Sequence, residues 1–167
     1  MINSTPLSLL IIEDNPGDCI LLKEQLQQMQ LPVKNVVHAV NMEKIPSIIK
    51  DNNFDIVLLD LSLPDSNGID SVITIDRLLP KTPIIVLSGV SSLEIATETI
   101  SLGAQDYLVK GEFDPKLMAK TIQYSIERKR TLENLRLSNE RYELINKATL
   151  DTTWEYNFDT NIGQWGE

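Results

Sequence analysis

Short apolar segments alternate along the chain with longer segments in which apolar residues recur every three or four positions. Five of the short segments are rich in Val, Ile and Leu and nearly continuous, which is typical of strands buried on both faces of a sheet. They are Leu7–Ile12, Val33–Val40, Asp55–Leu59, Pro83–Leu87 and Asp106–Val109. The alternation predicts an α/β fold, with a parallel sheet, right-handed crossovers and helices on both faces.

The segments between these strands carry apolar stripes at helical spacing. The stripes are Ile20, Leu21, Leu22, Leu26 and Met29; Ile45, Ile48 and Ile49; Ile69, Val72, Ile73 and Leu78; and Leu93, Ala96 and Ile100. Pro16 is expected in the first turn of the first helix, where proline is favoured. Gly103 is expected to end the fourth helix, because glycine tolerates a positive φ.

The region from Lys116 to about Ala148 contains no Gly or Pro and predicts one helix of roughly 30 residues. Its first part is expected to complete the domain. The part from Arg128 to Lys147 has a narrow apolar stripe and is expected to project. A coiled coil that joins two protomers is the preferred interpretation, and a single solvated helix is the alternative.

The last segment, Asp151–Glu167, alternates aromatic and polar residues. This pattern predicts one strand, a turn at Asp159–Gly163 and the start of another strand. Two strands alone form at best a marginal sheet, so the chain is expected to stop inside a second domain.

Composition narrows the function classes. The 167 residues carry a net charge of −9, with 42% hydrophobic and 23% charged residues. The proportions of hydrophobic and charged residues are typical of a globular protein. The negative net charge argues against nucleic acid as a partner. No apolar run approaches the ~20 residues of a membrane span and there is no signal-peptide pattern, so we expect a cytoplasmic protein without a membrane partner. The single cysteine, Cys19, is expected in the core, and the single histidine, His38, in a structural role.

Acidic, hydroxyl and basic residues follow four of the predicted strands. Glu13 and Asp14 follow the first strand, Asp60 the third, Ser88 the fourth and Lys110 the fifth. Each has an ordinary structural interpretation when it is taken singly, as a helix cap, a turn or a strand end. Together they predict one site, because ligands of an open α/β sheet bind at the carboxyl ends of its strands.

The residue types indicate the chemistry of this site. Three adjacent carboxylates need a compensating cation, and oxygen ligands without His or Cys favour Mg²⁺. A carboxylate can act as a nucleophile toward phosphorus and form an aspartyl phosphate. Asp60 is the predicted nucleophile, and Ser88 and Lys110 are expected to hydrogen-bond the transferred group.

Four motifs carry a resemblance to a known family. They are Ile12-Glu13-Asp14-Asn15; Asp60-Leu61-Ser62-Leu63-Pro64-Asp65 with Gly68; Val86-Leu87-Ser88-Gly89; and Asp106-Tyr107-Leu108-Val109-Lys110. In this order and spacing the chain resembles the bacterial response-regulator receiver domain over about residues 5–128. The resemblance implies a flavodoxin-like, doubly wound, five-stranded parallel sheet of strand order 2-1-3-4-5, here with an extended C-terminal helix, and a receiver domain at residues 1–128.

The resemblance also implies roles in a two-component phosphorelay. Asp60 would accept phosphate from a phosphohistidine on a sensor histidine kinase or a phosphotransfer protein. Glu13 and Asp14 would hold Mg²⁺, with Asp60 and the main-chain carbonyl of Ser62 as further ligands.

The remaining motif residues would form the switch. Lys110 would contact the phosphate, Ser88 would be the switch hydroxyl and Tyr107 the switch aromatic residue. The face made by the fourth helix, fifth strand and fifth helix would then change. A homodimer is expected through this face or through the C-terminal helix.

The segment after the receiver is expected to lead to an output region. Residues 129–148 would be a helical linker, with a coiled coil as the preferred interpretation, and residues 149–167 the truncated start of a second domain. From about Arg141 the sequence resembles the beginning of a PAS domain. Both a histidine kinase and a cyclic-dinucleotide enzyme are compatible with a PAS domain as the later output region, and nothing in the sequence separates the two. This segment itself is not expected to be an enzyme, apart from an autophosphatase activity of the phosphoacceptor switch.

Three alternatives stay open. An aspartyl-nucleophile phosphatase is disfavoured because Ser62 stands where such enzymes usually carry a second Asp. A degenerate receiver used only for dimerisation or docking is disfavoured by the intact site residues. A DNA-binding regulator is disfavoured by the acidic charge and by a tail that does not read as a helix-turn-helix.

Overall fold

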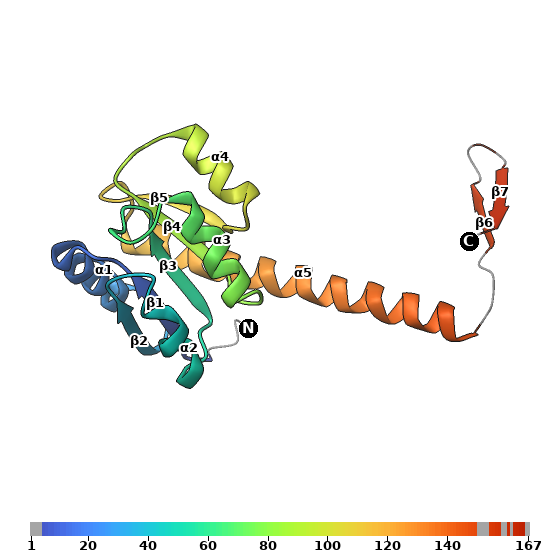
Figure 1. Cartoon of the computed structure of the whole chain (residues 1–167), viewed down its shortest axis with the longest axis horizontal. Helices are drawn as coiled ribbons and strands as arrows, with labels where there is room; N and C mark the ends of the chain where they lie inside the picture. Colours follow the sequence, from blue (N-terminus) through green and yellow to red (C-terminus); the bar gives the residue numbers. More distant parts are fainter. Residues whose placement is uncertain (1–4, 150–153, 158–159, 161, 166–167) are drawn as a thin grey trace. The chain divides into compact units, whose positions relative to one another are not determined.

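The computed structural model describes residues 5–149, 154–157, 160 and 162–165. The chain divides into two compact units, Met1–Arg130 and Thr131–Glu167. The first unit is built from alternating strands and helices (Figure 1). Its elements are β1 (Leu7–Ile12), α1 (Pro16–Gln28), β2 (Val33–Ala39), α2 (Ile45–Asp51), β3 (Ile56–Asp60), α3 (Ile69–Leu78), β4 (Ile84–Ser88), α4 (Leu93–Ser101), β5 (Asp106–Val109) and the start of α5 (Pro115–Thr149).

The five strands form one parallel sheet in the order β2-β1-β3-β4-β5. This order and the long C-terminal helix confirm the predicted fold. Strands β3 and β4 each lie one residue further along the chain than predicted, so that Asp60 and Ser88 are their last residues. Asp55 stands outside β3, and its carboxylate accepts a hydrogen bond of 2.8 Å from the Ser8 amide.

Two hydrophobic clusters cover the two faces of the sheet. Alternate residues of β1 enter different clusters, with Leu9 packing beneath α1 and α5, and Leu10 beneath α2 and α3. Every residue of β3 and β4 is buried, as expected for central strands that meet helices on both sides. The nearly continuous apolar runs of the sequence are explained by this double burial.

Two predicted helical stripes are wrong in part. In α1 the core face consists of Cys19, Leu22 and Leu26, whereas Ile20 and Leu21 are 59% and 60% exposed. Spacing of 3 and 4 residues aligns the first three on one side of the helix and turns the intervening positions away from the sheet. Cys19 is buried, as predicted.

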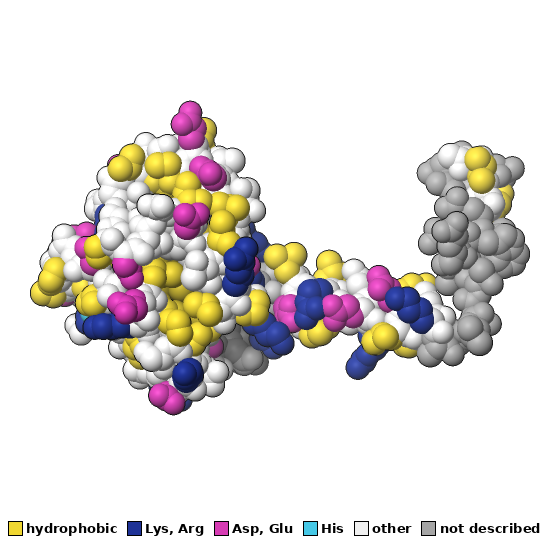
Figure 2. All heavy atoms as spheres, in the orientation of Figure 1, with side chains coloured by type: hydrophobic (Ala, Val, Ile, Leu, Met, Phe, Trp, Pro, Cys, Tyr) yellow, Lys and Arg dark blue, Asp and Glu magenta, His cyan; other side chains and the backbone are white. Residues whose placement is uncertain are grey.

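The predicted stripe on α4 is also wrong, since Leu93 is 84% exposed and Ile100 is 47% exposed. The buried residue of α4 is Thr99. Its hydroxyl donates to the carbonyls of Ile95 and Ala96, which removes the cost of burying a polar group. Figure 2 shows apolar side chains on the surface of the first unit around α4.

The second unit contains the C-terminal part of α5 and a hairpin of β6 (Trp154–Asn157) and β7 (Ile162–Trp165). The strands are antiparallel, with Trp154 opposite Trp165. The two predicted strands are confirmed, and Gly163 belongs to β7, where it pairs with Tyr156, rather than to the predicted turn. Asp159 and Asn161 of that turn lie outside the described residues. Within the described ranges, no helix combines the length and the apolar character needed to cross a bilayer.

Gly103 ends α4 with a φ of 115°, as predicted. A Cβ atom at this position would stand 3.1 Å from Cγ of Asp76. Gly103→Ala is therefore expected to lower the free energy of unfolding by roughly 1–3 kcal/mol, because the backbone conformation and the contact are both unfavourable. Urea denaturation would measure the loss. Gly89→Ala is the matched control, since a Cβ atom there would meet nothing within 4 Å and little change is expected; an equal loss in both variants would contradict the assignment.

Candidate functional site

The carboxyl edge of the sheet gathers the residues that the sequence singles out. Glu13 and Asp14 follow β1, Asp60 is the last residue of β3, and Lys110 follows β5. Because β3 lies between β1 and β4 in the sheet, the ends of these strands are neighbours. Carboxylate oxygens of Glu13, Asp14 and Asp60 all lie within 4.8 Å of one another.

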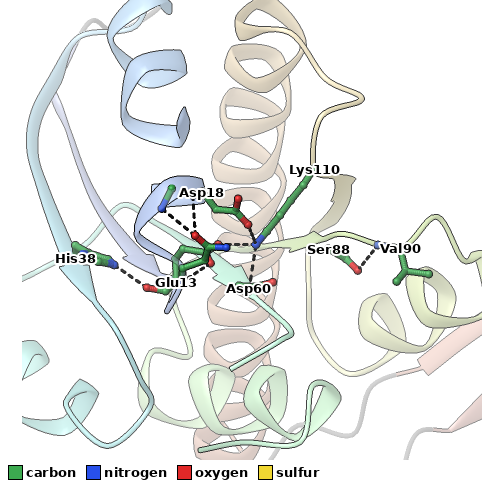
Figure 3. A network of polar contacts seen from close by, with 9 residues as sticks. Glu13, Asp18, His38, Asp60, Ser88, Val90 and Lys110 are labelled. Carbon is green, nitrogen blue, oxygen red and sulfur yellow. Dashed lines mark hydrogen bonds and ion pairs between the residues drawn. The ribbon is translucent and has the colours of Figure 1, made fainter. Parts of the chain in front are cut away.

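The Lys110 ammonium group connects this cluster (Figure 3). Its Nζ atom lies 2.7 Å from Oε2 of Glu13, 2.8 Å from Oδ2 of Asp18 and 3.1 Å from Oδ2 of Asp60. Two of these contacts, with Glu13 and Asp18, are hydrogen bonds from the ammonium group, and the contact with Asp60 is an ion pair.

Burial makes the charges of this cluster strongly interdependent. Glu13 is 1% exposed and Asp60 is 2% exposed. Burial raises the pKa of the Glu13 carboxyl, with the Asp60 charge adding to this effect and the Lys110 hydrogen bond opposing it. A raised folded-state pKa means that the stability contributed by Glu13 is complete in acid and is lost as the pH rises through that pKa.

Lys110 remains a cation in this environment. Burial alone would lower its pKa, but its hydrogen bonds to Asp18 and Glu13, together with the Asp60 charge, raise the pKa well above its usual range. The backbone of Lys110 is fixed by a hydrogen bond of 2.7 Å from its amide to the Ser88 carbonyl. The site therefore holds one permanent positive charge on an anchored backbone.

One carboxylate oxygen of the cluster is left over. Oδ1 of Asp60 is buried and has no hydrogen-bond partner among the residues that the structure describes. A buried anionic oxygen without a partner is costly, and it calls for a cation or a covalent bond. The cluster offers oxygen ligands only, a donor set that suits a hard cation such as Mg²⁺.

Ser88 and Tyr107 are not joined to the carboxylates. The Ser88 hydroxyl accepts a hydrogen bond of 3.1 Å from the Val90 amide, and Figure 3 shows it on the β4 side of Asp60. The Tyr107 hydroxyl donates to the Val90 carbonyl. Both predicted switch residues thus contact the same residue in the loop before α4.

The loop after β3 carries Ser62, two residues beyond Asp60. Further along this loop, the Asp65 carboxylate accepts hydrogen bonds of 3.1 and 3.0 Å from the amides of Met42 and Glu43. The loop is therefore tied to the segment that follows β2.

Asp18 was missed from the sequence, although it contacts Lys110 directly. It lies in the first turn of α1, four residues after Asp14. The signal that could have identified it is its place at the start of the helix that follows β1, next to the carboxyl edge of the sheet. His38 has the structural role that we expected, since its Nε2 atom lies 2.7 Å from the Glu13 carbonyl oxygen and donates to it.

Residues 9–123 match the model of the family described as "Response regulator receiver domain". The chain belongs to the response regulator receiver domain family. The receiver is 33% identical over 101 residues to the response regulator protein PilR of Pseudomonas aeruginosa, a match that covers 60% of this chain and 22% of PilR. It is 31% identical over 114 residues to the cell cycle transcriptional regulator CtrA of Caulobacter vibrioides, covering 68% of this chain and 48% of CtrA. This chain thus spans less than half the length of either relative.

Solved receiver domains share the fold. The beryllofluoride-activated NtrC4 receiver domain dimer aligns with a TM-score of 0.63 and 24% identity over 73% of this chain and 98% of that one. A BeF3-activated DrrB receiver domain aligns with a TM-score of 0.59 and 25% identity over 74% of this chain and 99% of that one. The likeness agrees with the five-stranded parallel sheet described above.

Removal of the Lys110 charge tests how much the stability of the receiver depends on this cation. Lys110→Met leaves Glu13 and Asp60 buried without their cation, so we expect the free energy of unfolding without divalent cations to fall by about 3 kcal/mol. Urea denaturation in EDTA would measure this loss.

Lys129→Met is the matched control for that experiment. Lys129 is 17% exposed and forms one ion pair of 3.2 Å with the half-exposed Asp76, so its removal should cost less than about 1 kcal/mol. Equal losses in the two variants would contradict the special role of the Lys110 cluster.

Proposed function

We propose that residues 1–128 act as a phosphorylation-dependent switch of a two-component system, with Asp60 as the phosphoacceptor. The observation that carries the proposal is the buried Oδ1 atom of Asp60, which has no hydrogen-bond partner in the described part of the chain. The other oxygen of Asp60 is held by Lys110 at 3.1 Å. A carboxylate that is held through one oxygen and has its other oxygen without a partner is arranged to act as a nucleophile toward phosphorus.

The donor would be a phosphohistidine on a histidine kinase or a phosphotransfer protein. An Asp60 oxygen attacks the phosphorus atom, an O–P bond forms and the P–N bond to the imidazole breaks. The imidazole nitrogen keeps the electron pair and takes a proton from solvent. Lys110 then donates to a phosphoryl oxygen, which stabilises the charge on the transferred group.

A divalent cation fits the same edge. Glu13, Asp14 and Asp60 would hold Mg²⁺ together with the main-chain carbonyl of Ser62, because all four supply hard oxygen ligands. When bound, Mg²⁺ neutralises charge that develops on the phosphoryl oxygens. The Asp65 hydrogen bonds described above would keep the Ser62 loop in place.

The response to phosphate would pass through Ser88 and Tyr107. A hydrogen bond from Ser88 to a phosphoryl oxygen turns its hydroxyl away from the Val90 amide. Because the Tyr107 hydroxyl is hydrogen-bonded to the Val90 carbonyl, a displacement of the loop also changes the position of this tyrosine. The surface formed by α4, β5 and α5 then differs between the two states.

Phosphorylation by acetyl phosphate in the presence of Mg²⁺ tests the assignment. Intact-mass measurement should show one added phosphoryl group on the wild type and none on Asp60→Asn, which keeps the shape of the side chain but loses the nucleophile. EDTA should abolish the label in the wild type. Asp70→Asn, a change of an exposed acidic residue in the first turn of α3, is the control and should label normally. Equal labelling of wild type and Asp60→Asn would rule out Asp60 as the acceptor.

The same experiment separates the alternatives. Steady turnover of small phosphoesters, with Ser62 in place of a second Asp, would indicate a phosphatase. A wild type that takes no label and binds no BeF₃⁻ would indicate a degenerate receiver used for docking.

We further propose that residues 129–148 form a linker that dimerises and that residues 149–167 begin a PAS-like output region. Leu132, Leu135 and Tyr142 are 53%, 57% and 61% exposed along this part of α5, so an apolar stripe is left without a cover in the single chain. Arg136 bonds to Glu133 and Glu140 on its own helix, which supports a helix that is stable before it associates. A homodimer through the α4-β5-α5 surface is the alternative mode.

Leu135→Glu is expected to shift the protein from dimer to monomer in sedimentation velocity, because a charge would enter the proposed helix–helix contact. Leu137→Glu is the control, since Leu137 is 47% exposed and lies about 200° around the helix from Leu135. A wild type that is monomeric at every concentration, or a dimer that both changes disrupt equally, would contradict the coiled coil.

A further inference from the structure

The Lys110 ammonium group is shared by three carboxylates. It donates hydrogen bonds of 2.7 and 2.8 Å to Glu13 and Asp18, and it forms an ion pair of 3.1 Å with Asp60. A phosphoryl oxygen on Asp60 would be a further anionic partner, and it would compete with these carboxylates for the same ammonium group. The backbone of Lys110 is held at the end of β4 by the hydrogen bond from its amide to the Ser88 carbonyl, so the side chain has to make the adjustment.

The three carboxylates differ in how easily they can give up the lysine. Glu13 is 1% exposed, so its charge would be left in a place that water does not reach. Asp60 is 2% exposed and is itself the group to which phosphorus binds. Asp18 is 38% exposed, at the start of α1, and water can replace the lysine at its carboxylate. Asp18 is thus the partner whose release costs least.

From this we infer that Asp18 is a positioning residue that holds Lys110 in the unphosphorylated state and competes with the phosphoryl group for it. The inference rests on the proposed function, since it assumes that phosphate binds at Asp60. Asp18 adds a third negative charge around Lys110, which also disfavours an incoming anion. Its carboxylate therefore sets how tightly the receiver binds the phosphoryl group and how long that group stays.

The experiment compares BeF₃⁻ binding, followed by ¹⁹F NMR in the presence of Mg²⁺, in the wild type and in Asp18→Asn. Asparagine keeps the size of the side chain and removes the charge. The Kd for BeF₃⁻ is expected to fall about fivefold, the size of effect typical of one charge-assisted hydrogen bond at a partly exposed position. Asp18→Glu keeps a carboxylate within reach and should retain the wild-type Kd.

Two controls separate positioning from a general effect of charge or of stability. Glu24→Gln removes a charge from an exposed position of the same helix, and it should leave the Kd unchanged. In a Lys110→Met background, Asp18→Asn should have no further effect on the Kd, because the two residues act through one contact. If Asp18 had a merely structural role, Asp18→Asn would weaken BeF₃⁻ binding. It would not produce a lower Kd that depends on the presence of Lys110.

The outcomes are distinguishable. An unchanged or higher Kd in Asp18→Asn, with a wild type that binds BeF₃⁻ normally, would overturn the inference and leave the proposed function intact. If Asp18→Asn also lowers the Kd for BeF₃⁻ in the Lys110→Met background, the inference would be overturned, since the effect would then be one of net charge. A wild type that binds no BeF₃⁻ and takes no phosphoryl label would overturn both proposals.

Discussion

The ammonium group of Lys110, held among three carboxylates at the carboxyl edge of the sheet, is the interaction on which the rest of the site depends. Two of these carboxylates, Glu13 and Asp60, are almost fully buried. Burying two such carboxylates side by side is costly without a compensating cation. The sheet makes this possible because its strand order brings the ends of β1, β3 and β5 within reach of one lysine side chain. The site therefore combines one cation, shared by three carboxylates, with an unsatisfied carboxylate oxygen at its centre.

A closely packed framework surrounds this site. Strands β3 and β4 are buried along their whole length between two hydrophobic clusters. The lysine backbone is part of that framework, through the Ser88 carbonyl. Under the proposed function, an event at Asp60 would therefore act on neighbouring side chains and on the loop before α4 rather than on these packed strands.

The sequence predicts the fold and most of the site for one reason. Parallel strands end at a common edge, so residues that follow separate apolar runs, such as Asp60 and Lys110, can be assigned to one place before any coordinates are known. The strand order itself is implied by the resemblance to receiver domains, because periodicity does not say which strands are neighbours.

The orientation of helices was harder to predict. Apolar spacing identified α1 and α4 but did not reveal that Ile20 and Leu93 face solvent, since that depends on where each helix axis lies over the sheet. Asp18 was missed because a single Asp in a first helical turn is ordinarily a cap or a solvated charge.

The two hydrogen bonds of Val90 have a wider consequence for the loop before α4. Its amide is held by the Ser88 hydroxyl and its carbonyl by the Tyr107 hydroxyl, so side chains rather than the sheet ladder hold this residue on both sides. Under the proposed function, these two hydrogen bonds contribute directly to the energy needed to displace the loop. Substitutions at the two hydroxyls would then be a route by which the sensitivity of the proposed switch is retuned over generations.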